Sequence, residues 1–377
     1  MQYKGSCKIA ASFKIAVQDI KGPYRNKVSY KPLGKSRTAH LHWPRLNHEE
    51  RNNVKAIVCK EYGPPESLLI EDIQPPQLEP NQVRIAVKAC GVNFPDFLII
   101  AGNYQVKPPL PFTPGAELSG EIIETGSDVN HLLAGQRVLA MTQFGCMAEE
   151  VCVNAAAVMP IPDSMEYETA AGFMLTYGTA YHALKQRGHL QANETLLVLG
   201  AAGGVGLAAV ELGAAMGAKV IAAASSDEKL ALAKEFGAAH VINYAENRIK
   251  DAVKEFSRGR GVDVILDPVG GDLFDDCLRA VAWNGRILVI GFAGGKIQSI
   301  PANLPLLKGS SIIGVFWGRF TEEQPAEHLA NTKELLAMFV AGELRPHISR
   351  TFPLEEASAA IRCLADRSAL GKVIVTI

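Results

Sequence analysis

Short apolar runs alternate with polar and helix-like segments through the second half of the chain. Continuous apolar runs of this length are typical of strands buried on both faces, and their alternation with helices is typical of a doubly wound parallel sheet. The pattern therefore predicts an α/β domain with a parallel sheet over residues 174–324. The six predicted strands are TLLVLG (195–200), KVIAAA (219–224), HVINY (240–244), VDVILDPV (262–269), RILVIGF (286–292) and SIIGVFW (311–317).

The first half has a different pattern, in which short alternating strands are broken by proline and glycine. It begins with VKAIVCKEYGPPESLLIEDI (54–73) and continues through NQVRIAVKACGVNFPDFLI (81–99) and LSGEIIETGSDVNHLLAGQRVLAM (118–141). Such alternation predicts a β-rich domain, here over residues 54–173. A helical stretch and the apolar run GKVIVTI close the chain, and we expect residues 325–377 to complete this first domain.

The turn after the first strand of the predicted parallel sheet consists of glycine and alanine. Ala201, Gly203 and Gly206 have the spacing A-x-G-x-x-G, one alanine away from the dinucleotide-binding fingerprint, and Gly204 and Val205 lie inside it. Small residues there let main-chain N–H groups and a helix N-terminus approach a pyrophosphate. These five residues are therefore predicted to bind a dinucleotide.

This small-residue segment has two other interpretations, a membrane span and a small-residue helix packed in a core. A membrane span is excluded, because the uncharged run between Glu194 and Glu211 is interrupted by glycines and is shorter than the roughly 20 apolar residues that a bilayer needs. A small-residue helix packed in a core is the second alternative. The apolar run at 218–225 favours the dinucleotide site, because that motif requires a strand, a turn, a helix and a second strand.

The end of the second predicted strand indicates which dinucleotide is bound. An NAD site usually places Asp or Glu there, whereas this chain has Ala224, Ser225 and Ser226, with Lys229 one helical turn further on. Serine hydroxyls can donate to a 2′-phosphate, and lysine supplies a positive charge. We therefore expect NADPH rather than NADH, with Ser225 and Lys229 as ligands; the alternative for Lys229 is a solvated helix residue.

Charge is distributed unevenly along the 377 residues, a length that predicts two domains. The formal net charge is −1, but residues 1–48 hold ten Lys or Arg against the single acidic residue Asp19. Subtracting these from the 38 basic and 39 acidic residues of the chain leaves 28 and 38 for the remainder. This acidic balance argues against a nucleic-acid-binding surface. Seven cysteines without a C-x-x-C pair fit a reducing compartment.

Residues 1–53 form a basic, acid-poor extension that is unlike the rest of the chain. Such a composition is typical of an organelle transit segment and predicts a mitochondrial location. Pro23, Gly34 and the run HLHWPRLNHEE interrupt any amphipathic helix, however. A disordered extension, or a wrongly chosen start codon with a cytoplasmic protein, therefore remains an alternative.

Four segments together resemble the medium-chain dehydrogenase/reductase superfamily. They are GVNFPDFLIIAGNY (91–104), PPLPFTPGAELSGEIIETG (108–126), GAAGGVG (200–206) and FAGG (292–295). Within that superfamily the chain resembles, over residues 54–377, the zinc-free quinone oxidoreductase (zeta-crystallin) family. The resemblance implies a GroES-like catalytic domain, a Rossmann domain, a homodimer, and NADPH-dependent reduction of quinones or activated alkenes.

The positions of the zinc ligands in zinc-dependent relatives are changed in this chain. Those relatives have Cys in a G-V-C stretch and His in a G-H-E stretch, where this chain has Asn93 and Ala116. The segment MLTYGTAY (174–181) has threonine and tyrosine where a third ligand is expected. Because catalytic zinc needs about three protein ligands, we expect no bound metal. Polarisation of the acceptor must then come from hydrogen bonds.

The resemblance also suggests which side chains serve the reaction. Asn93 can offer an amide N–H and Tyr104 a phenolic proton to the acceptor's oxygen, and the alternatives are a turn-capping asparagine and a tyrosine packed in a loop. Thr176 matches a position beside the nicotinamide, although it also fits a helix cap, and Phe292 is expected among the cofactor-binding residues. Tyr244 matches a tyrosine near the adenosine phosphate, or it is a buried residue at a strand end.

The function expected from the sequence is NADPH-dependent, zinc-independent hydride transfer to a quinone or an α,β-unsaturated carbonyl compound. An enoyl thioester reductase is the alternative within the same class of enzymes. A dinucleotide-binding protein without turnover, acting as a structural or sensing protein, is the alternative from another class. The expected partners are a small-molecule quinone or enone and a second copy of the chain, and neither a nucleic acid nor a membrane span is expected.

Overall fold

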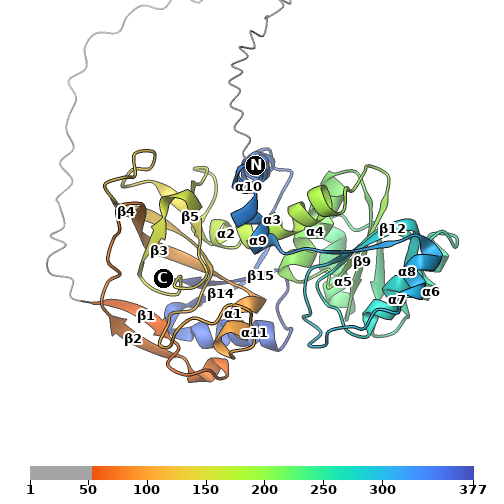
Figure 1. The fold of residues 1–377 in the computed structure, drawn as a ribbon, viewed down its shortest axis with the longest axis horizontal. Helices are drawn as coiled ribbons and strands as arrows, with labels where there is room; N and C mark the ends of the chain where they lie inside the picture. The colour runs from red at the N-terminus through yellow and green to blue at the C-terminus, as the bar shows by residue number, and fades with distance from the viewer. Residues whose placement is uncertain (1–52) are drawn as a thin grey trace, which may run out of the picture. The chain divides into compact units, whose positions relative to one another are not determined.

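The computed structural model describes residues 53–377, and its second half contains the predicted parallel sheet (Figure 1). All six predicted strands are present and parallel, in the order β10-β9-β8-β11-β12-β13. The α/β prediction is therefore confirmed. The strands are β8 (Thr195–Leu199), β9 (Lys219–Ala224), β10 (His240–Asn243), β11 (Val262–Asp267), β12 (Val281–Val289) and β13 (Ser311–Gly314).

Helices connect these strands and cover the sheet. The order of the strands reverses between β8 and β11, and in open parallel sheets ligands bind at the carboxyl ends of the strands beside such a switch point. The glycine turn follows β8 and therefore lies there. The connecting helices are α4 (Gly204–Ala215), α5 (Asp227–Glu235), α6 (Ile249–Phe256), α7 (Leu273–Ala280) and α8 (Asn303–Lys308).

The first half of the chain and its last residues build a second sheet of seven strands. β15 (Lys372–Thr376) lies inside this sheet, parallel to β14 (Ile348–Pro353) and antiparallel to β3 (Gln82–Val92), so residues far apart in the sequence become neighbours. The other strands are β4 (Glu117–Thr125), β5 (Arg137–Met141), β6 (Glu150–Asn154) and β7 (Val158–Pro160), while β1 (Val54–Val58) and β2 (Leu69–Ile73) form a separate pair.

The remaining helices lie between or beside the sheets. α3 (Met174–His182) packs on α4 and continues into a π-helical turn at Ala183–Arg187. Within residues 53–377 no helix combines the length and the apolar character that crossing a bilayer requires. The other helices are α1 (Phe94–Ile100), α2 (Tyr167–Ala171), α9 (Trp317–Glu323), α10 (Pro325–Val340) and α11 (Ala357–Ala365), with 3₁₀ turns at Pro65–Ser67, Ala155–Ala157 and Leu354–Glu356. The limits proposed for the two domains stay predictions.

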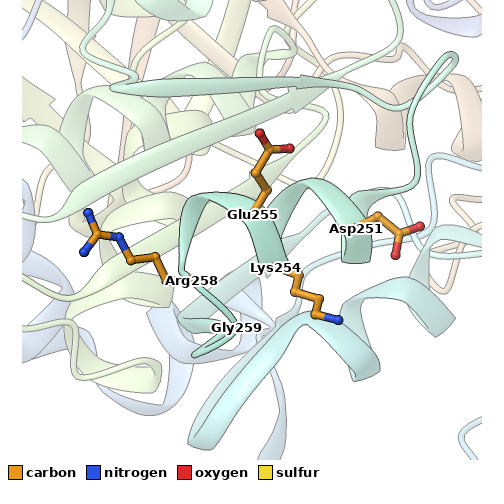
Figure 2. Close-up of a pocket in the computed structure, with 5 residues that line it drawn as sticks. All are labelled: Asp251, Lys254, Glu255, Arg258 and Gly259. Carbon is orange, nitrogen blue, oxygen red and sulfur yellow. The ribbon is translucent and has the colours of Figure 1, made fainter.

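A surface hollow lies at the end of α6 (Figure 2). Five residues line it: Asp251, Lys254, Glu255, Arg258 and Gly259. The side chains carry charges of both signs and, in Figure 2, they point away from one another. None of the predicted site residues belongs to it, and we assign it no role.

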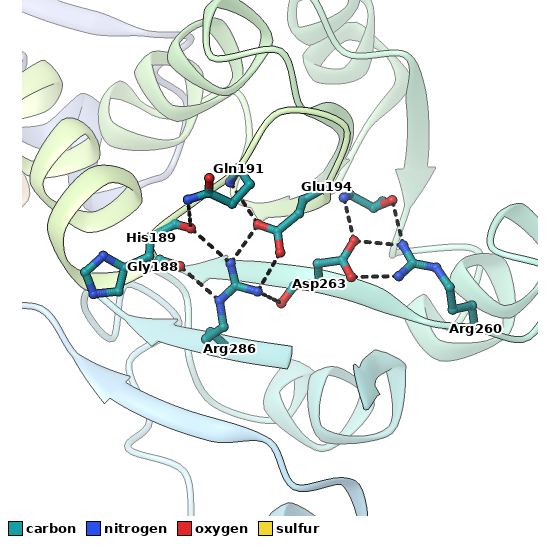
Figure 3. Close-up of polar contacts among 8 residues, drawn as sticks. Gly188, His189, Gln191, Glu194, Arg260, Asp263 and Arg286 are labelled. Atoms are coloured by element: carbon teal, nitrogen blue, oxygen red, sulfur yellow. Dashed lines mark hydrogen bonds and ion pairs between the residues drawn. The ribbon is translucent and has the colours of Figure 1, made fainter. Parts of the chain in front are cut away.

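A network of ion pairs joins the amino ends of the central parallel strands (Figure 3). Arg286 contacts Glu194, just before β8, with 2.7 Å between Nη2 and Oε2. Arg260 pairs with Asp263 of β11, which also accepts the Thr195 N–H at 2.8 Å. The Arg286 guanidinium lowers the pKa of the Glu194 carboxyl by hydrogen bonding to it. The network lies at the end of β8 opposite the glycine turn, so it contributes to the fold rather than to the candidate site.

Candidate functional site

Packing requires a glycine at position 206 of the glycine turn but does not require one at position 203. A Cβ added to Gly206 would lie 2.1 Å from the Gly200 carbonyl oxygen, so the contact between helix and turn excludes a side chain there. Around Gly203, the residue preceding α4, the nearest protein atom to such a Cβ is 3.4 Å away. The space beside Gly203 and the N-terminus of α4 therefore fits the approach of a pyrophosphate.

The rest of the turn is packed against the neighbouring helix. Ala201 is buried and its N–H donates to the Ala223 carbonyl at 3.1 Å, while Val205 is partly buried against the core. A Cβ on Gly204 would lie 2.9 Å from the Thr176 methyl carbon. The structure thus brings Thr176 of α3 next to the predicted dinucleotide turn.

Thr176 is buried, and its hydroxyl is used within its own helix. Its Oγ1 donates to the Gly172 carbonyl at 2.9 Å, while Phe173 occupies the N-cap position of α3. Thr176 is therefore not a helix cap. A hydroxyl has one donor but two acceptor lone pairs, so its oxygen retains the capacity to accept a hydrogen bond.

Ser225, Lys229 and Tyr244 gather beyond the end of β9. The Lys229 ammonium lies 3.3 Å from the Ser225 hydroxyl and 3.0 Å from the Arg367 carbonyl oxygen. Burial raises the pKa of the Tyr244 phenol, against smaller opposite effects of Ser225 and of the Arg367 charge. The Lys229 ammonium, the Ser225 hydroxyl and the Tyr244 phenol thus lie together, with the charge of Arg367 near the phenol, and such a set of groups suits a phosphate.

Arg367 could not be found from the sequence pattern. It stands 138 residues after Lys229 and comes from the loop that precedes β15. The same loop reaches the glycine turn, because the Gly371 N–H donates to the Ala202 carbonyl at 2.7 Å. The contact of this loop with Lys229 could have been expected only by knowing that the last strand, β15, joins the first sheet.

Phe292 lies just after the end of β12, 38% exposed. A Cβ on Gly270 would lie 3.0 Å from its ring, so Phe292 covers the turn that follows β11. Its position at the carboxyl edge of the sheet agrees with a place beside a bound dinucleotide, which stays a prediction.

Asn93 lies at the N-cap of α1, buried, and its side-chain amide is fully engaged within the protein. Nδ2 donates to the Gly91 carbonyl at 3.2 Å and to Glu117 Oε1 at 2.9 Å, and Oδ1 accepts from the Lys372 ammonium at 2.6 Å. The expectation that Asn93 offers a free N–H to an acceptor is corrected accordingly, because both amide hydrogens already have acceptors. The sequence indicated neither Glu117 nor Lys372.

Tyr104 lies half-buried in the loop after α1, packed against the core of the first sheet. Among residues 53–377 its hydroxyl has no hydrogen-bond partner. Burial raises the pKa of the Tyr104 phenol, and the nearby Asp96 carboxylate adds to the increase. Burial also raises the pKa of Asp96 to about 7. Tyr104 therefore keeps its proton at neutral pH, with the hydroxyl free to donate.

The positions of the zinc ligands in zinc-dependent relatives lie beside a buried ammonium group. Asn93 contacts Lys372, and Ala116, also buried, precedes Glu117. Over the described range 53–377, no three His, Cys, Asp or Glu side chains are grouped as a metal site would require. That the protein functions without metal stays a prediction.

Comparisons with known proteins agree with this geometry. The family model for the alcohol dehydrogenase GroES-like domain matches residues 79–163, and that for the zinc-binding dehydrogenase domain matches residues 204–332. A quinone oxidoreductase-like protein 2 homolog of Nematostella vectensis is 41% identical over 369 residues, 97% of this chain and 99% of the relative. Quinone oxidoreductase-like protein 2 of Rattus norvegicus is 41% identical over 87% of this chain and 93% of its own length.

A solved structure extends the comparison. Escherichia coli quinone oxidoreductase complexed with NADPH superimposes with a TM-score of 0.80 at 27% identity, over 86% of this chain and 99% of that one. The two domain models, the level of identity and the near-complete coverage all agree. The chain therefore belongs to the quinone oxidoreductase family of the medium-chain dehydrogenase/reductase superfamily.

Proposed function

We propose that this NADPH-dependent oxidoreductase reduces quinones or α,β-unsaturated carbonyl compounds without a metal ion. One observation carries the proposal: the open space at Gly203 and the group of Ser225, Lys229 and Arg367 lie at the carboxyl ends of β8 and β9, with Thr176 of α3 packed against Gly204. When bound, NADPH supplies the hydride. At two positions that hold zinc ligands in zinc-dependent relatives, this chain has the amide of Asn93 and the methyl group of Ala116. Such a site suits an acceptor that is already activated.

The residues of this chain divide into three groups for binding the cofactor. Gly203, Gly204 and the N-terminus of α4 would hold the pyrophosphate. Thr176 and Phe292 would lie beside the nicotinamide. The 2′-phosphate would be bound by Ser225, Lys229, Tyr244 and Arg367, of which the two cations supply the charge that distinguishes it from a ribose hydroxyl.

On the acceptor side, Tyr104 is the proposed donor. Its hydroxyl is protonated and unpartnered among the described residues, so it can donate to an oxygen on which negative charge develops. Asn93 would orient the start of α1 rather than contact the acceptor, because its amide is engaged.

The function is tested by measuring NADPH oxidation with a panel of ortho-quinones, enones and enoyl thioesters. We expect turnover with quinones and enones, and less with thioesters. Preferential turnover of thioesters would replace the proposal with an enoyl thioester reductase. Binding of NADPH without turnover of any acceptor would instead indicate a binding or sensing protein.

Substitution of Lys229 by Glu is expected to remove the preference for NADPH. Loss of a charged contact to phosphate costs about 1.5 to 3 kcal/mol, which is roughly 10- to 150-fold in affinity. Affinity for NADH should change little, because NADH lacks the 2′-phosphate. Titration of both cofactors by fluorescence measures this. Lys234→Glu, an exposed charge reversal on the same helix, is the control; an unchanged preference in Lys229→Glu would contradict the assignment.

We also propose that the protein forms a homodimer through the β13 edge of the parallel sheet. In the described part of the chain β13 pairs with β12 alone, and α8 buries none of its residues. Leu306, Leu307 and Trp283 are 77%, 66% and 71% exposed, and the Trp283 ring lies close to Gly309 at the end of α8. Apolar surface of this kind marks an interface in soluble proteins.

The dimer is tested by sedimentation. The wild-type protein is expected to sediment as a dimer and Leu306→Glu as a monomer, because a buried carboxylate would oppose association. Leu133→Glu, an equally drastic change at an exposed leucine outside this edge, should leave the dimer intact. A monomeric wild type would refute the interface.

Direction of the chain to mitochondria by residues 1–53 is a further proposal, and residues 1–52 lie outside the described part.

A further inference from the structure

Asn93, Glu117 and Lys372 form a buried polar network that the proposed chemistry does not use directly. The three residues are 4%, 1% and 5% exposed. The Lys372 ammonium contacts Glu117 Oε1 and donates to Asn93 Oδ1 at 2.6 Å, and Asn93 Nδ2 donates to the same carboxylate oxygen at 2.9 Å. Each member of the network therefore contacts the other two.

The second oxygen of Glu117 extends the network to another element. Glu117 Oε2 accepts the Leu175 N–H at 3.1 Å, in the first turn of α3 and next to Thr176. One carboxylate thus holds the start of α1 with one oxygen and the start of α3 with the other. The start of α3 carries Thr176 on the nicotinamide side, and α1 leads at its other end to the loop that carries Tyr104 on the acceptor side.

Two glycines make room for the network. A Cβ on Gly91 would lie 2.6 Å from Glu117 Oε1, and one on Gly172 would lie 2.7 Å from Lys372 Cγ. Lys372 also follows Gly371, whose N–H is bound to the glycine turn through Ala202. The ion pair is therefore enclosed by the elements that it connects.

We propose that Glu117 and Lys372 are positioning residues that fix the spacing between the acceptor side and the nicotinamide side of the site. The inference rests on the proposed function. Stability alone does not account for such a pair, because buried ion pairs can often be replaced by apolar residues without loss. A role in fixing the distance between the two sides of the site does account for the pair, since a misplacement of about 1 Å at a reacting centre costs on the order of a hundredfold in rate.

The test is a cycle of Glu117→Gln, Lys372→Met and the double variant. Each single variant leaves one buried charge unpaired, so the melting temperature of the cofactor-free protein should fall by more than about 5 °C. The double variant removes both charges and should recover most of that loss. Its kcat should nevertheless stay at least about tenfold below wild type, because the single carbonyl oxygen of glutamine replaces two acceptor oxygens.

Affinity for NADPH, measured by fluorescence, separates positioning from direct contact with the cofactor. We expect the Kd of the double variant to stay within about threefold of wild type, since the phosphate-binding residues are unchanged. Glu194→Gln with Arg286→Met is the matched control. It removes a partly buried pair at the opposite end of β8 and should leave kcat unchanged.

The possible results have distinct meanings. Wild-type kcat in the double variant would make the pair structural only, and a parallel loss of NADPH affinity would make it a cofactor contact; either overturns the inference. Absence of turnover in the wild type overturns the proposed function, and this inference with it. If the double variant does not fold, Glu117→Gln is measured below its melting transition and must show the same fall in kcat with NADPH bound normally.

Discussion

Replacing Tyr104 with phenylalanine is expected to lower kcat for enones by roughly ten- to ten-thousandfold, the range between weak and strong general-acid effects, and for quinones far less. The ring would keep its packing against the first sheet while the unpartnered hydroxyl is lost. An enone needs a proton donor for the charge that develops on oxygen. The anion formed from a quinone is already well stabilised and needs the proton less.

Steady-state kinetics with one enone and one ortho-quinone at saturating NADPH measures this difference. Tyr62→Phe is the matched control, because the Tyr62 hydroxyl donates to the Pro108 carbonyl at 3.1 Å and its ring covers Gly102 in the same loop. That variant should affect both substrates equally. An equal loss on both substrates in Tyr104→Phe would make Tyr104 a positioning residue, and no loss on either would leave it a tyrosine packed in a loop.

Alanine substitutions at Gly203 and Gly206 are expected to have different effects, the first on cofactor binding and the second on the stability of the fold. Gly206→Ala forces a Cβ to 2.1 Å from a backbone oxygen, so we expect a loss of about 1 to 3 kcal/mol in the free energy of unfolding. Gly203→Ala places its Cβ 3.4 Å from the nearest protein atom, at a φ of −81° that alanine readily adopts. It should fold like wild type and bind NADPH about a hundredfold more weakly.

The measurements are thermal unfolding of the cofactor-free proteins and titration with NADPH. Gly203→Ala serves as the stability control for Gly206→Ala, and wild type serves as the binding control. If Gly203→Ala bound NADPH as wild type does, the pyrophosphate would not approach the chain at this residue. If Gly206→Ala were as stable as wild type, the close contact with Gly200 would be relieved by movement of the turn.

Features that depend on neighbouring residues could be predicted from the sequence, and contacts between distant segments could not. The six strands follow from local apolar runs, while the roles of Ser225 and Lys229, which their distance after the glycine turn indicates, stay predictions. Arg367 and Lys372 lie far from that motif in the sequence. They reach the site only because β15 inserts beside β3, which no periodicity encodes.

Asn93 shows the same limit within a correctly recognised segment. Its identity and its place before a helix were readable from GVNFPD, and so was its alternative role as a cap. Whether its amide hydrogens were free depended on Glu117 and Lys372, which lie 24 and 279 residues further along the chain. Whether a donor is free depends on how its neighbours pack around it, so the residue type alone could not predict it.

The insertion of β15 beside β3 has a consequence for how the protein is made. At a synthesis rate of about 5 to 20 residues per second, Lys372 leaves the ribosome roughly 15 to 55 s after Asn93, 279 residues earlier. During that interval the Ala89–Val92 part of β3 has no partner on the edge opposite β4, whereas all six strands of the parallel sheet, from β8 to β13, have been made. The parallel sheet therefore has time to form first, and the nascent first sheet must be kept from aggregating until its last strand arrives.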